Sequence, residues 1–370
     1  MVATQPKFKV EFKENAVLAI QRQQRGKVVM ILNDSTNALI DRAEYRTLGD
    51  VKASDWSTAN YKRITLAFMG NPYKVIIVKT ATGSGEDFTD TLAKLNYYDN
   101  YTLCYPEAVT AELNAIKSYI NTIRQTNNYS RAVVANITSP DAQYIINFVS
   151  TGNITANIVG TAEEFTPGDY TARIAGALCG LPASRSITYY EFPEIVNCPI
   201  SATPDADVAA GKLVILHQDG TYKMGRGVNS LVTLTDGVTE AFQKIRLMET
   251  MDMIANDIVT TYRTGYVGKY INNFTNKNRF VGAINGYLLD LAAEGLLEEA
   301  NDNVVYISYE KTRSYLRNKG VDVDNMTYQQ IITANTGSKV LLDGVCSPTD
   351  TMEDLDLGMF LFQAMQQIAA

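Results

Sequence analysis

Residues 56–79 read WSTANYKRITLAFMGNPYKVIIVK, in which a helical pattern leads directly into a strand pattern. The spacing of the apolar side chains predicts a helix over Trp56–Met69. Asn71-Pro72 ends this helix, because proline disfavours helical geometry in the residue before it. The β-branched run Lys74–Lys79 then predicts a buried strand. A helix that leads through a short break into a buried strand is typical of an α/β fold.

The same alternation extends from about residue 26 to residue 160. Strands are predicted over Lys27–Leu32, Tyr101–Cys104 and Arg131–Ile137, and helices over Asp87–Leu95, Thr110–Gln125 and Asp141–Val149. Strands that alternate with helices pair in parallel, because each helix carries the chain back across the sheet. This region is therefore predicted to form a mostly parallel sheet with covering helices.

Near residue 160 the order of the elements changes. Helices are predicted over Asp169–Cys179, Thr239–Thr264, Arg279–Glu294 and Tyr309–Arg317, strands over Ile187–Phe192 and Val304–Ser308, an extended piece over Lys339–Leu342, and a hairpin of Lys212–Leu216 with Thr221–Met224. This mixture lacks the βα repeat and predicts an α+β region. The fold class is therefore α/β plus α+β.

Each end of the chain contains an amphipathic strand pattern. Near the N-terminus the apolar side chains are Phe8, Val10 and Phe12, and near the C-terminus they are Leu355, Leu357, Met359 and Leu361. Polar side chains alternate with them, which is typical of a strand with one buried face. Neither strand has a hairpin partner beside it, and an unpaired amphipathic strand promotes aggregation unless it is used. We therefore expect two extended arms that add to the sheet of a neighbouring molecule.

The two ends also differ in charge. Residues 1–25 contain five basic and two acidic side chains, a net charge of +3, whereas residues 340–370 contain five acidic side chains and no Lys or Arg, a net charge of −5. Opposite charges at the two ends favour head-to-tail pairing between copies. Ordinary scatter of charge along a chain is the alternative interpretation.

The overall composition excludes several classes of protein. The 370 residues include 33 basic and 40 acidic side chains and 1 His, so the net charge of −7 argues against a protein that grips nucleic-acid phosphates. No apolar stretch approaches the roughly 18 residues of a membrane span. Met1–Lys7 lacks the apolar region of a secretory signal, so we expect synthesis in the cytoplasm.

Few residues could support catalysis or metal binding. The four cysteines, Cys104, Cys179, Cys198 and Cys346, have no C-x-x-C spacing, which argues against a zinc site or a disulfide framework. His217 precedes the turn signal Asp219-Gly220 and is interpreted as a hairpin residue rather than a base or ligand. We expect no catalytic, cofactor-binding or metal-binding residues.

A glycine-rich loop suggests one alternative function. Gly83-Ser84-Gly85 lies between a predicted strand and a predicted helix, where phosphate-binding loops occur. However, the third glycine of G-x-G-x-x-G is replaced by Phe88, and the carboxylates of Glu86-Asp87 would repel a phosphate. An ordinary loop is favoured, and a soluble nucleotide-using α/β enzyme is the alternative function.

A basic cluster occupies the predicted helix Tyr309–Arg317. Its members are Lys311, Arg313, Arg317 and, just beyond the helix, Lys319, with Glu310 as the acidic neighbour. Arg313 and Arg317 are four residues apart and share a helix face. The cluster is either a solvated face or a docking site for an acidic protein surface.

Several stretches of the second half resemble one known family. They are ARIAGALCGLPASRSIT (172–188), GKLV (211–214), KMGRGVNSL (223–231), the Lys244–Ile258 helix, YVGKY (266–270), TGSKV (336–340) and DTMEDL (350–355). In this order they resemble contractile tail sheath proteins of phages and phage-derived particles, over about residues 165–362. Residues before 160 match only in pattern, as is typical of a variable outward-facing domain.

The resemblance implies a structural protein and not an enzyme. Sheath subunits form stacked hexameric rings in a helical polymer around a tail tube, are linked by strand exchange of terminal arms, and contract to drive the tube through a cell envelope. The implied partners are further copies of the chain, the tail tube protein, and baseplate and tail terminator proteins. No cofactor, nucleic acid or membrane is implied.

The resemblance also implies a domain organisation. It consists of an N-terminal arm (1–25), an outer α/β domain (26–165), an inner tube-proximal α+β domain (166–350) and a C-terminal arm (351–370). Lys311, Arg313, Arg317 and Lys319 are then expected to face the tube. The subunit is expected to be made in the bacterial host cytoplasm and to join a virion tail or a released R-type bacteriocin particle.

Overall fold

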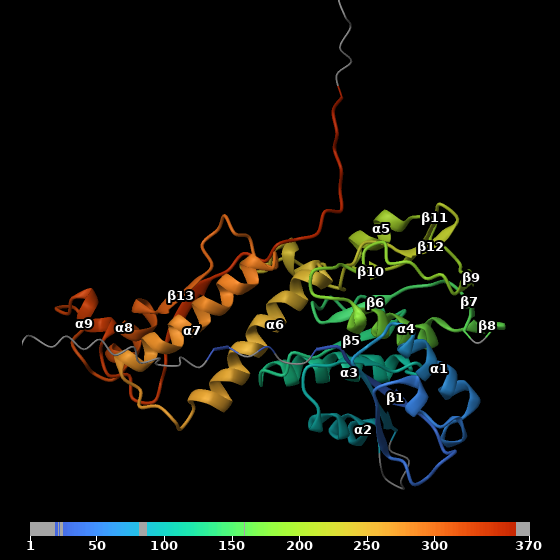
Figure 1. The fold of residues 1–370 in the computed structure, drawn as a ribbon, viewed down its shortest axis with the longest axis horizontal. Helices are drawn as coiled ribbons and strands as arrows, with labels where there is room; N and C mark the ends of the chain where they lie inside the picture. Colours follow the sequence, from blue (N-terminus) through green and yellow to red (C-terminus); the bar gives the residue numbers. More distant parts are fainter. Residues whose placement is uncertain (1–18, 21, 23–24, 81–86, 159, 360–370) are drawn as a thin grey trace, which may run out of the picture.

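The computed structural model describes residues 19–20, 22, 25–80, 87–158 and 160–359. The molecule is elongated (Figure 1), with a layered α/β body at one end and helices α8 (Tyr309–Asn318) and α9 (Tyr328–Ile332) at the other. Two long helices, α6 (Ile245–Thr261) and α7 (Phe274–Ala293), connect these ends. The predicted residues Phe8, Val10, Phe12 and Leu361, and the loop Gly83-Ser84-Gly85, lie outside the described residues.

A seven-stranded sheet forms the centre of the body, with the order β10-β6-β5-β4-β1-β3-β2. Its strands are β1 (Lys27–Leu32), β2 (Arg42–Tyr45), β3 (Lys74–Lys79), β4 (Thr102–Cys104), β5 (Arg131–Ala135), β6 (Ile145–Phe148) and β10 (Lys212–Leu213). The pairs are parallel except at the edge, where β2 pairs antiparallel with β3. The mostly parallel sheet that the βα repeat predicts is confirmed.

Helices cover both faces of this sheet. α1 (Thr58–Phe68) and α4 (Pro167–Gly180) lie on one face, and α2 (Phe88–Lys94) and α3 (Thr110–Arg124) lie on the other. Val28 and Met30 of β1 belong to the first core and Val29 to the second. Successive side chains of a strand point to opposite faces, so a strand covered on both sides is apolar throughout.

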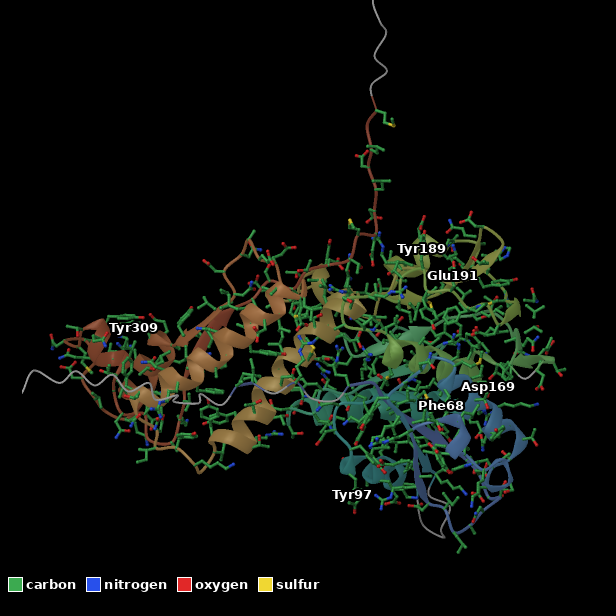
Figure 2. The ribbon with its side chains drawn as sticks, viewed as in Figure 1. Phe68, Tyr97, Asp169, Tyr189, Glu191 and Tyr309 are labelled. Carbon is green, nitrogen blue, oxygen red and sulfur yellow. The ribbon has the colours of Figure 1, made fainter. Side chains whose placement is uncertain are left out.

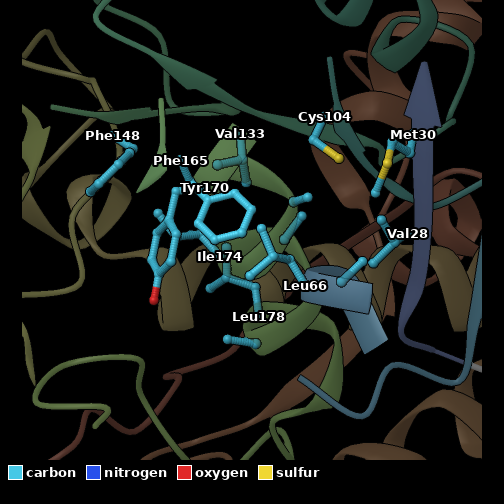
Figure 3. Packing of buried hydrophobic residues seen from close by; sticks show 14 of the residues in the cluster. Val28, Met30, Leu66, Cys104, Val133, Phe148, Phe165, Tyr170, Ile174 and Leu178 are labelled. Carbon is cyan, nitrogen blue, oxygen red and sulfur yellow. The ribbon is translucent and has the colours of Figure 1, made fainter. Parts of the chain in front are cut away.

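Figure 3 shows the first of these cores. Tyr170, Ile174 and Leu178 of α4 lie in one cluster with Val133 and Cys104 of the sheet. α4 and β10 lie beyond residue 165, yet the first packs on the seven-stranded sheet and the second belongs to it.

Smaller elements surround the sheet. They are β7 (Ile154–Asn157), β8 (Ala162–Phe165) and β9 (Ile195–Asn197) in one small sheet, the hairpin β11 (Ile215–Gln218) with β12 (Thr221–Met224), α5 (Pro204–Ala209), and the 3-10 turns Leu48–Asp50, Ala53–Asp55, Leu95–Tyr97 and Glu240–Gln243. Residues 215–224 confirm the expected hairpin.

The rest of the chain forms the elongated part. Its elements are α6 (Ile245–Thr261), a π-helical turn (Tyr262–Tyr266), α7 (Phe274–Ala293), β13 (Val304–Ile307), α8 (Tyr309–Asn318), α9 (Tyr328–Ile332) and β14 (Leu342–Val345). Met253 and Ile254 of α6 pack with Phe280 and Ile284 of α7 in a third core, which Ile20 joins from the N-terminal segment. In the described part of the chain, no helix has the length and apolar character of a membrane span.

Ion pairs connect α6 to α3 and to the sheet. Arg124 of α3 binds Asp252, and Arg131 of β5 binds Glu249 with 2.6 Å between Nη2 and Oε1. Burial raises the pKa of the Asp252 carboxyl, although Arg124 acts in the opposite direction. The elongated part is therefore joined to the sheet by charged as well as apolar contacts.

Two predicted elements are wrong. The helix predicted over Asp141–Val149 is absent, and Ile145–Phe148 forms strand β6, which is buried along its whole length. Ser139 and Asp141 have φ of 41°, which opposes a helical start at this point. A short apolar run fits a buried strand as well as a helix, and pairing with β5 selects the strand.

The strand predicted over Ile187–Phe192 is also absent. Tyr189 has φ of 56°, so the backbone cannot remain extended there. Within this stretch only Glu191 forms a β-bridge, with Lys223. The predicted strand Lys212–Leu216 divides at Val214 into β10, which joins the large sheet, and the start of β11, which pairs with β12.

Candidate functional site

The C-terminal segment leaves the molecule at a defined point. Thr349 bonds through its backbone N–H to the Leu296 carbonyl, and residues 350–354 then cross the start of α6. The segment that follows projects away from the body (Figure 1). Leu355, Leu357 and Met359 are 88%, 68% and 84% exposed and belong to no strand of the isolated chain.

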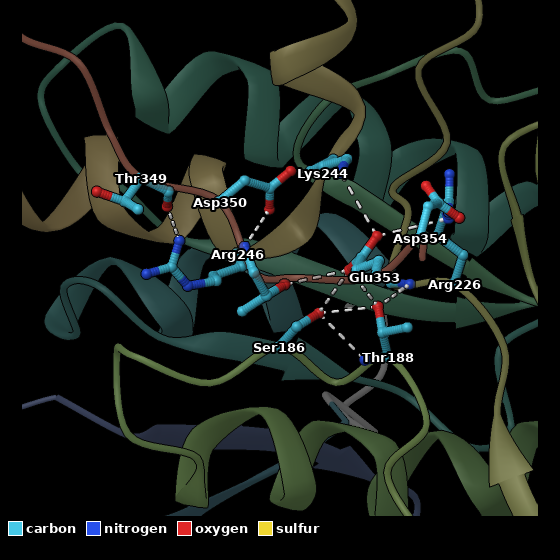
Figure 4. A network of polar contacts seen from close by, with 11 residues as sticks. Ser186, Thr188, Arg226, Lys244, Arg246, Thr349, Asp350, Glu353 and Asp354 are labelled. Atoms are coloured by element: carbon cyan, nitrogen blue, oxygen red, sulfur yellow. Dashed lines mark hydrogen bonds and ion pairs between the residues drawn. The ribbon is translucent and has the colours of Figure 1, made fainter. Parts of the chain in front are cut away.

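Three carboxylates hold the base of this segment, and we call the group the C-terminal clamp (Figure 4). It consists of Asp350, Glu353 and Asp354 with their partners Lys244 and Arg226. Lys244 pairs with Asp350 and Arg226 with Asp354, while both cations also approach Glu353 Oε2, at 3.4 and 3.5 Å.

Glu353 lies at the centre of the clamp, and its side chain is only 7% exposed. Its Oε1 accepts a hydrogen bond of 2.8 Å from Thr188 Oγ1 and weaker ones from Ser186 and Thr351, at 3.4 and 3.3 Å. Buried carboxylates are retained in proteins where such donors and counter-charges replace water. Glu353 has both.

The clamp also shifts the acid–base equilibria of its cations. A hydrogen bond to Asp354 raises the pKa of Arg226. Burial on its own would lower the pKa of Lys244, but the bonds and charges of Asp350 and Glu353 outweigh it and raise that pKa. Both cations are therefore held in their charged form.

A second candidate surface is the two-stranded sheet of β13 and β14. Val304 pairs with Val345 and Tyr306 with Asp343 in an antiparallel register. In the described part of the chain no third strand joins this sheet, and Val304, Tyr306 and Val345 are 37%, 47% and 52% exposed. On β13 the N–H and C=O groups of Val305 already bond to the Asn285 side chain, so the edge of this sheet that is suited to strand addition is that of β14.

The predicted basic cluster lies on α8, at the end of the molecule opposite the sheet, where Figure 2 labels Tyr309. The structure brings to it acids that lie outside the helix itself. Arg313 and Arg317 both bind Asp324 Oδ1, at 2.8 and 3.0 Å. The excess of positive charge on this face is therefore smaller than the sequence indicates.

The remaining two members of the cluster also have contacts. Lys311 pairs with Asp343, and the Lys319 ammonium lies 5.9 Å from the Tyr315 ring centre. Side chains of Lys311 and Arg317 are still 55% and 57% exposed. The cluster therefore remains accessible on the surface of α8.

The other candidate residues have structural roles. His217 lies in β11 opposite Tyr222, with 4.6 Å between the ring centres, as expected of a hairpin residue. The four cysteines are free thiols, and among the described residues no group of His, Cys, Asp and Glu has the arrangement of a metal site.

The carboxyl end of β1 is where a doubly wound sheet would bind a nucleotide. There Asp34 accepts hydrogen bonds from the Ser57 and Thr36 N–H groups and from Asn60 Nδ2, at 2.7 to 2.9 Å. Burial alone would raise the pKa of Asp34, but these bonds hold it well below its usual range. Asp34 therefore stabilises the start of α1 through its hydrogen bonds to Ser57 and Asn60.

Comparisons with known proteins agree on one family. Residues 238–357 match the phage tail sheath C-terminal domain. The chain is 36% identical over 360 residues to the tail sheath protein of Clostridium phage phiCD119, an alignment that covers 94% of this chain and 97% of that protein.

Solved structures share the fold. The sheath tail protein of Desulfitobacterium hafniense aligns with a TM-score of 0.66 and 16% identity, over 81% of this chain and 93% of that one. A subunit of the helical sheath of the anti-feeding prophage in its contracted state aligns with a TM-score of 0.68 and 13% identity, over 97% of this chain and 99% of that one.

Proposed function

Because the chain belongs to the phage tail sheath protein family, a structural component of contractile tails and injection systems, we propose how it assembles and acts. The subunit polymerises as stacked hexameric rings around a tail tube, and its terminal arms link neighbouring subunits by strand exchange. Contraction of this polymer drives the tube through the cell envelope. The single observation that carries this proposal is that residues 355–359, the described part of the C-terminal arm beyond the clamp, belong to no strand and expose their apolar side chains.

The C-terminal arm needs a partner for physical reasons. Leu355, Leu357 and Met359 are all at least 68% exposed. Burial of a Leu or Met side chain contributes roughly 1.5–3 kcal/mol. An arm that adds to a neighbour's sheet gains this contribution and also pairs its backbone N–H and C=O groups.

The sheet of β13 and β14 is the receiving surface that we propose. The edge of β14 supplies backbone partners, since Asn285 occupies the backbone groups of Val305 on β13, and Val304, Tyr306 and Val345 supply an apolar face. The N-terminal arm, with Phe8, Val10 and Phe12, is proposed to add in the same way to another subunit. Of the five acidic side chains in residues 340–370, Asp343, Asp350, Glu353 and Asp354 already pair with cations of their own subunit. Charge therefore favours contact between the two arms less than the net charges of +3 and −5 indicate.

For the arrangement in the polymer we propose an outer domain of residues 26–165 and an inner, tube-proximal domain of residues 166–350. Lys311, Arg313, Arg317 and Lys319 then face the tube from the far end of the elongated part. Since α4 and β10 pack with the large sheet, the sheet unit in this scheme extends past the outer domain's boundary. Baseplate and tail terminator proteins are the partners at the two ends of the polymer.

We place the working protein in a phage tail or an extracellular contractile particle, after synthesis in the bacterial host cytoplasm. The alternative, a nucleotide-using enzyme, lacks a catalytic set of residues, and Asp34 at the edge of the sheet is occupied by its own hydrogen bonds. No observation on the described residues favours that alternative.

Electron microscopy of the purified protein tests the proposal. We expect the full chain to form long hollow tubes and a variant without residues 355–370 to remain as single subunits. That deletion removes the arm but retains Glu353 and Asp354 of the clamp. Tubes of normal length from the deleted variant would show that this arm does not link subunits.

A further inference from the structure

The exposure of the side chains changes abruptly at the base of the C-terminal arm. The Glu353 side chain is 7% exposed, whereas Leu355, two residues later, is 88% exposed. Asp354 between them still pairs with Arg226. The arm therefore leaves the subunit from a fixed point rather than from a gradually loosening tail.

The donors that hold Glu353 come from separate parts of the fold. Ser186 and Thr188 belong to the loop after α4, Arg226 follows β12, and Lys244 immediately precedes α6. The loop and the hairpin pack with the α/β body, and α6 begins the elongated part. Glu353 thus ties the arm to the junction between the two parts of its own subunit.

The loops that surround Glu353 are closely packed and bonded to each other. Thr188 Oγ1, which donates to Glu353, also accepts a hydrogen bond of 2.9 Å from the backbone N–H of Gly227. A Cβ atom on Gly227 would lie only 3.0 to 3.2 Å from Ile187, Ser186 and Thr188, so the two loops are in close contact. A carboxylate held by donors that are themselves fixed loses little further freedom when the arm binds.

We propose that Glu353 is the positioning residue of the C-terminal arm. It fixes the point and direction in which the arm leaves the subunit, so that the arm reaches one neighbour. It also transmits mechanical force from the arm to the junction between the α/β body and the elongated part. This inference rests on the proposed strand exchange. It goes further in assigning the anchoring of the arm to a buried carboxylate of its own subunit. A fixed root raises the effective concentration of the arm at its neighbour, because fewer orientations are available to it.

The test compares Glu353→Gln with Asp356→Asn, which removes the same charge from an exposed carboxylate on the same arm. Two quantities are measured: hydrogen exchange of residues 349–354 in the free subunit, and the critical concentration for tube formation. We expect Glu353→Gln to speed this exchange and to raise the critical concentration for tube formation about tenfold or more. Asp356→Asn should change the critical concentration by less than about twofold.

Two outcomes would overturn the inference. One is tube formation by Glu353→Gln at the same concentration as by Asp356→Asn. The other is a lower melting temperature of Glu353→Gln with unchanged exchange at 349–354, since this would assign Glu353 to the stability of the fold alone. If Glu353→Gln does not fold, Lys244→Gln takes its place, because it removes a counter-charge from the α6 side. Hydrogen exchange at 349–354 and the critical concentration are then compared with those of Asp356→Asn in the same way.

The variant without residues 355–370 separates this inference from the proposed function. If that deletion assembles normally, strand exchange by the arm is wrong. If the deletion blocks assembly and Glu353→Gln behaves like Asp356→Asn, the arm links subunits but Glu353 does not position it.

Discussion

Gly176 of α4 lies so close to Ala67 of α1 that a Cβ atom on Gly176 would come within 2.0 Å of the Ala67 carbonyl oxygen. The same contact continues along the two helices, where a Cβ on Gly180 would lie 1.7 Å from the Gly70 carbonyl oxygen. The glycines let two backbones approach closely on one face of the sheet. This approach places α4, from the second half of the sequence, on a sheet built by the first half.

We therefore predict that Gly176→Ala lowers the free energy of unfolding by about 2–3 kcal/mol or more, because α1 and α4 must move apart to admit the methyl group. The control is Gly286→Ala on the exposed face of α7, where no atom lies within 4 Å of the added Cβ. That change should raise the stability by about 0.5–1 kcal/mol, because alanine favours the helix. Denaturant unfolding measures both, and equal effects would contradict the close-contact interpretation.

Deletion of residues 1–15 should leave a folded, soluble subunit that no longer polymerises. The reason is that Ile20, which is packed in the third core, and the Arg22–Glu294 ion pair are retained, while Phe8, Val10 and Phe12 are lost. Electron microscopy and circular dichroism are the measurements. Deletion of residues 1–5, which spares the strand pattern, is the control and should assemble. Full-length tubes from the larger deletion would exclude this arm from assembly.

Leu357→Asp should block tube formation and leave the subunit's unfolding free energy within about 0.5 kcal/mol of wild type, since the side chain is 68% exposed in the free chain. Leu39→Asp makes the same change at a 95% exposed side chain between β1 and β2 and should not affect assembly. A large loss of subunit stability in Leu357→Asp would mean that the arm pairs within its own chain.

Arg313→Glu combined with Arg317→Glu should weaken co-assembly of sheath and tube but spare tubes formed by the sheath alone. Each exposed charge pair at an interface contributes only about 0–1 kcal/mol, so the effect depends on its repetition along the polymer. Asp324→Asn is the matched control, because it frees both arginines and should not weaken co-assembly. Normal tails from the double variant at moderate salt would exclude α8 from tube recognition.

The purified protein should neither bind ATP stoichiometrically nor hydrolyse it. In our proposal the energy of contraction comes from the difference between two packings of the subunits and is stored at assembly. Equilibrium dialysis and a phosphate-release assay measure the two activities. Stoichiometric binding would revive the nucleotide-using alternative.

The elements that the sequence predicts correctly are those in which the pattern of apolar residues agrees with their burial in the folded chain. β1 and β3 are confirmed at Lys27–Leu32 and Lys74–Lys79, and α3 differs from its prediction by one residue at its end. In β1 and β3 a continuous apolar run matches burial on both faces of the sheet, and in α3 the helical period of the apolar residues matches one buried face. The helix predicted over Asp141–Val149 failed because its apolar run suits either element, and pairing with β5 selects the strand.

The sequence by itself determined the βα repeat, the two amphipathic terminal patterns and the resemblance to sheath proteins, because these depend on the order and period of residues along the chain. Only the tertiary structure decided that α4 and β10 pack with the first half, that Asp324 and Asp343 pair with the basic cluster, and that Glu353 is buried while Leu355 is free. The physical reason is that burial and ion pairing depend on which distant residues become neighbours. Glu353 and Asp356 are both acidic residues of one short segment, and only the packing of Ser186, Thr188, Arg226 and Lys244 distinguishes them.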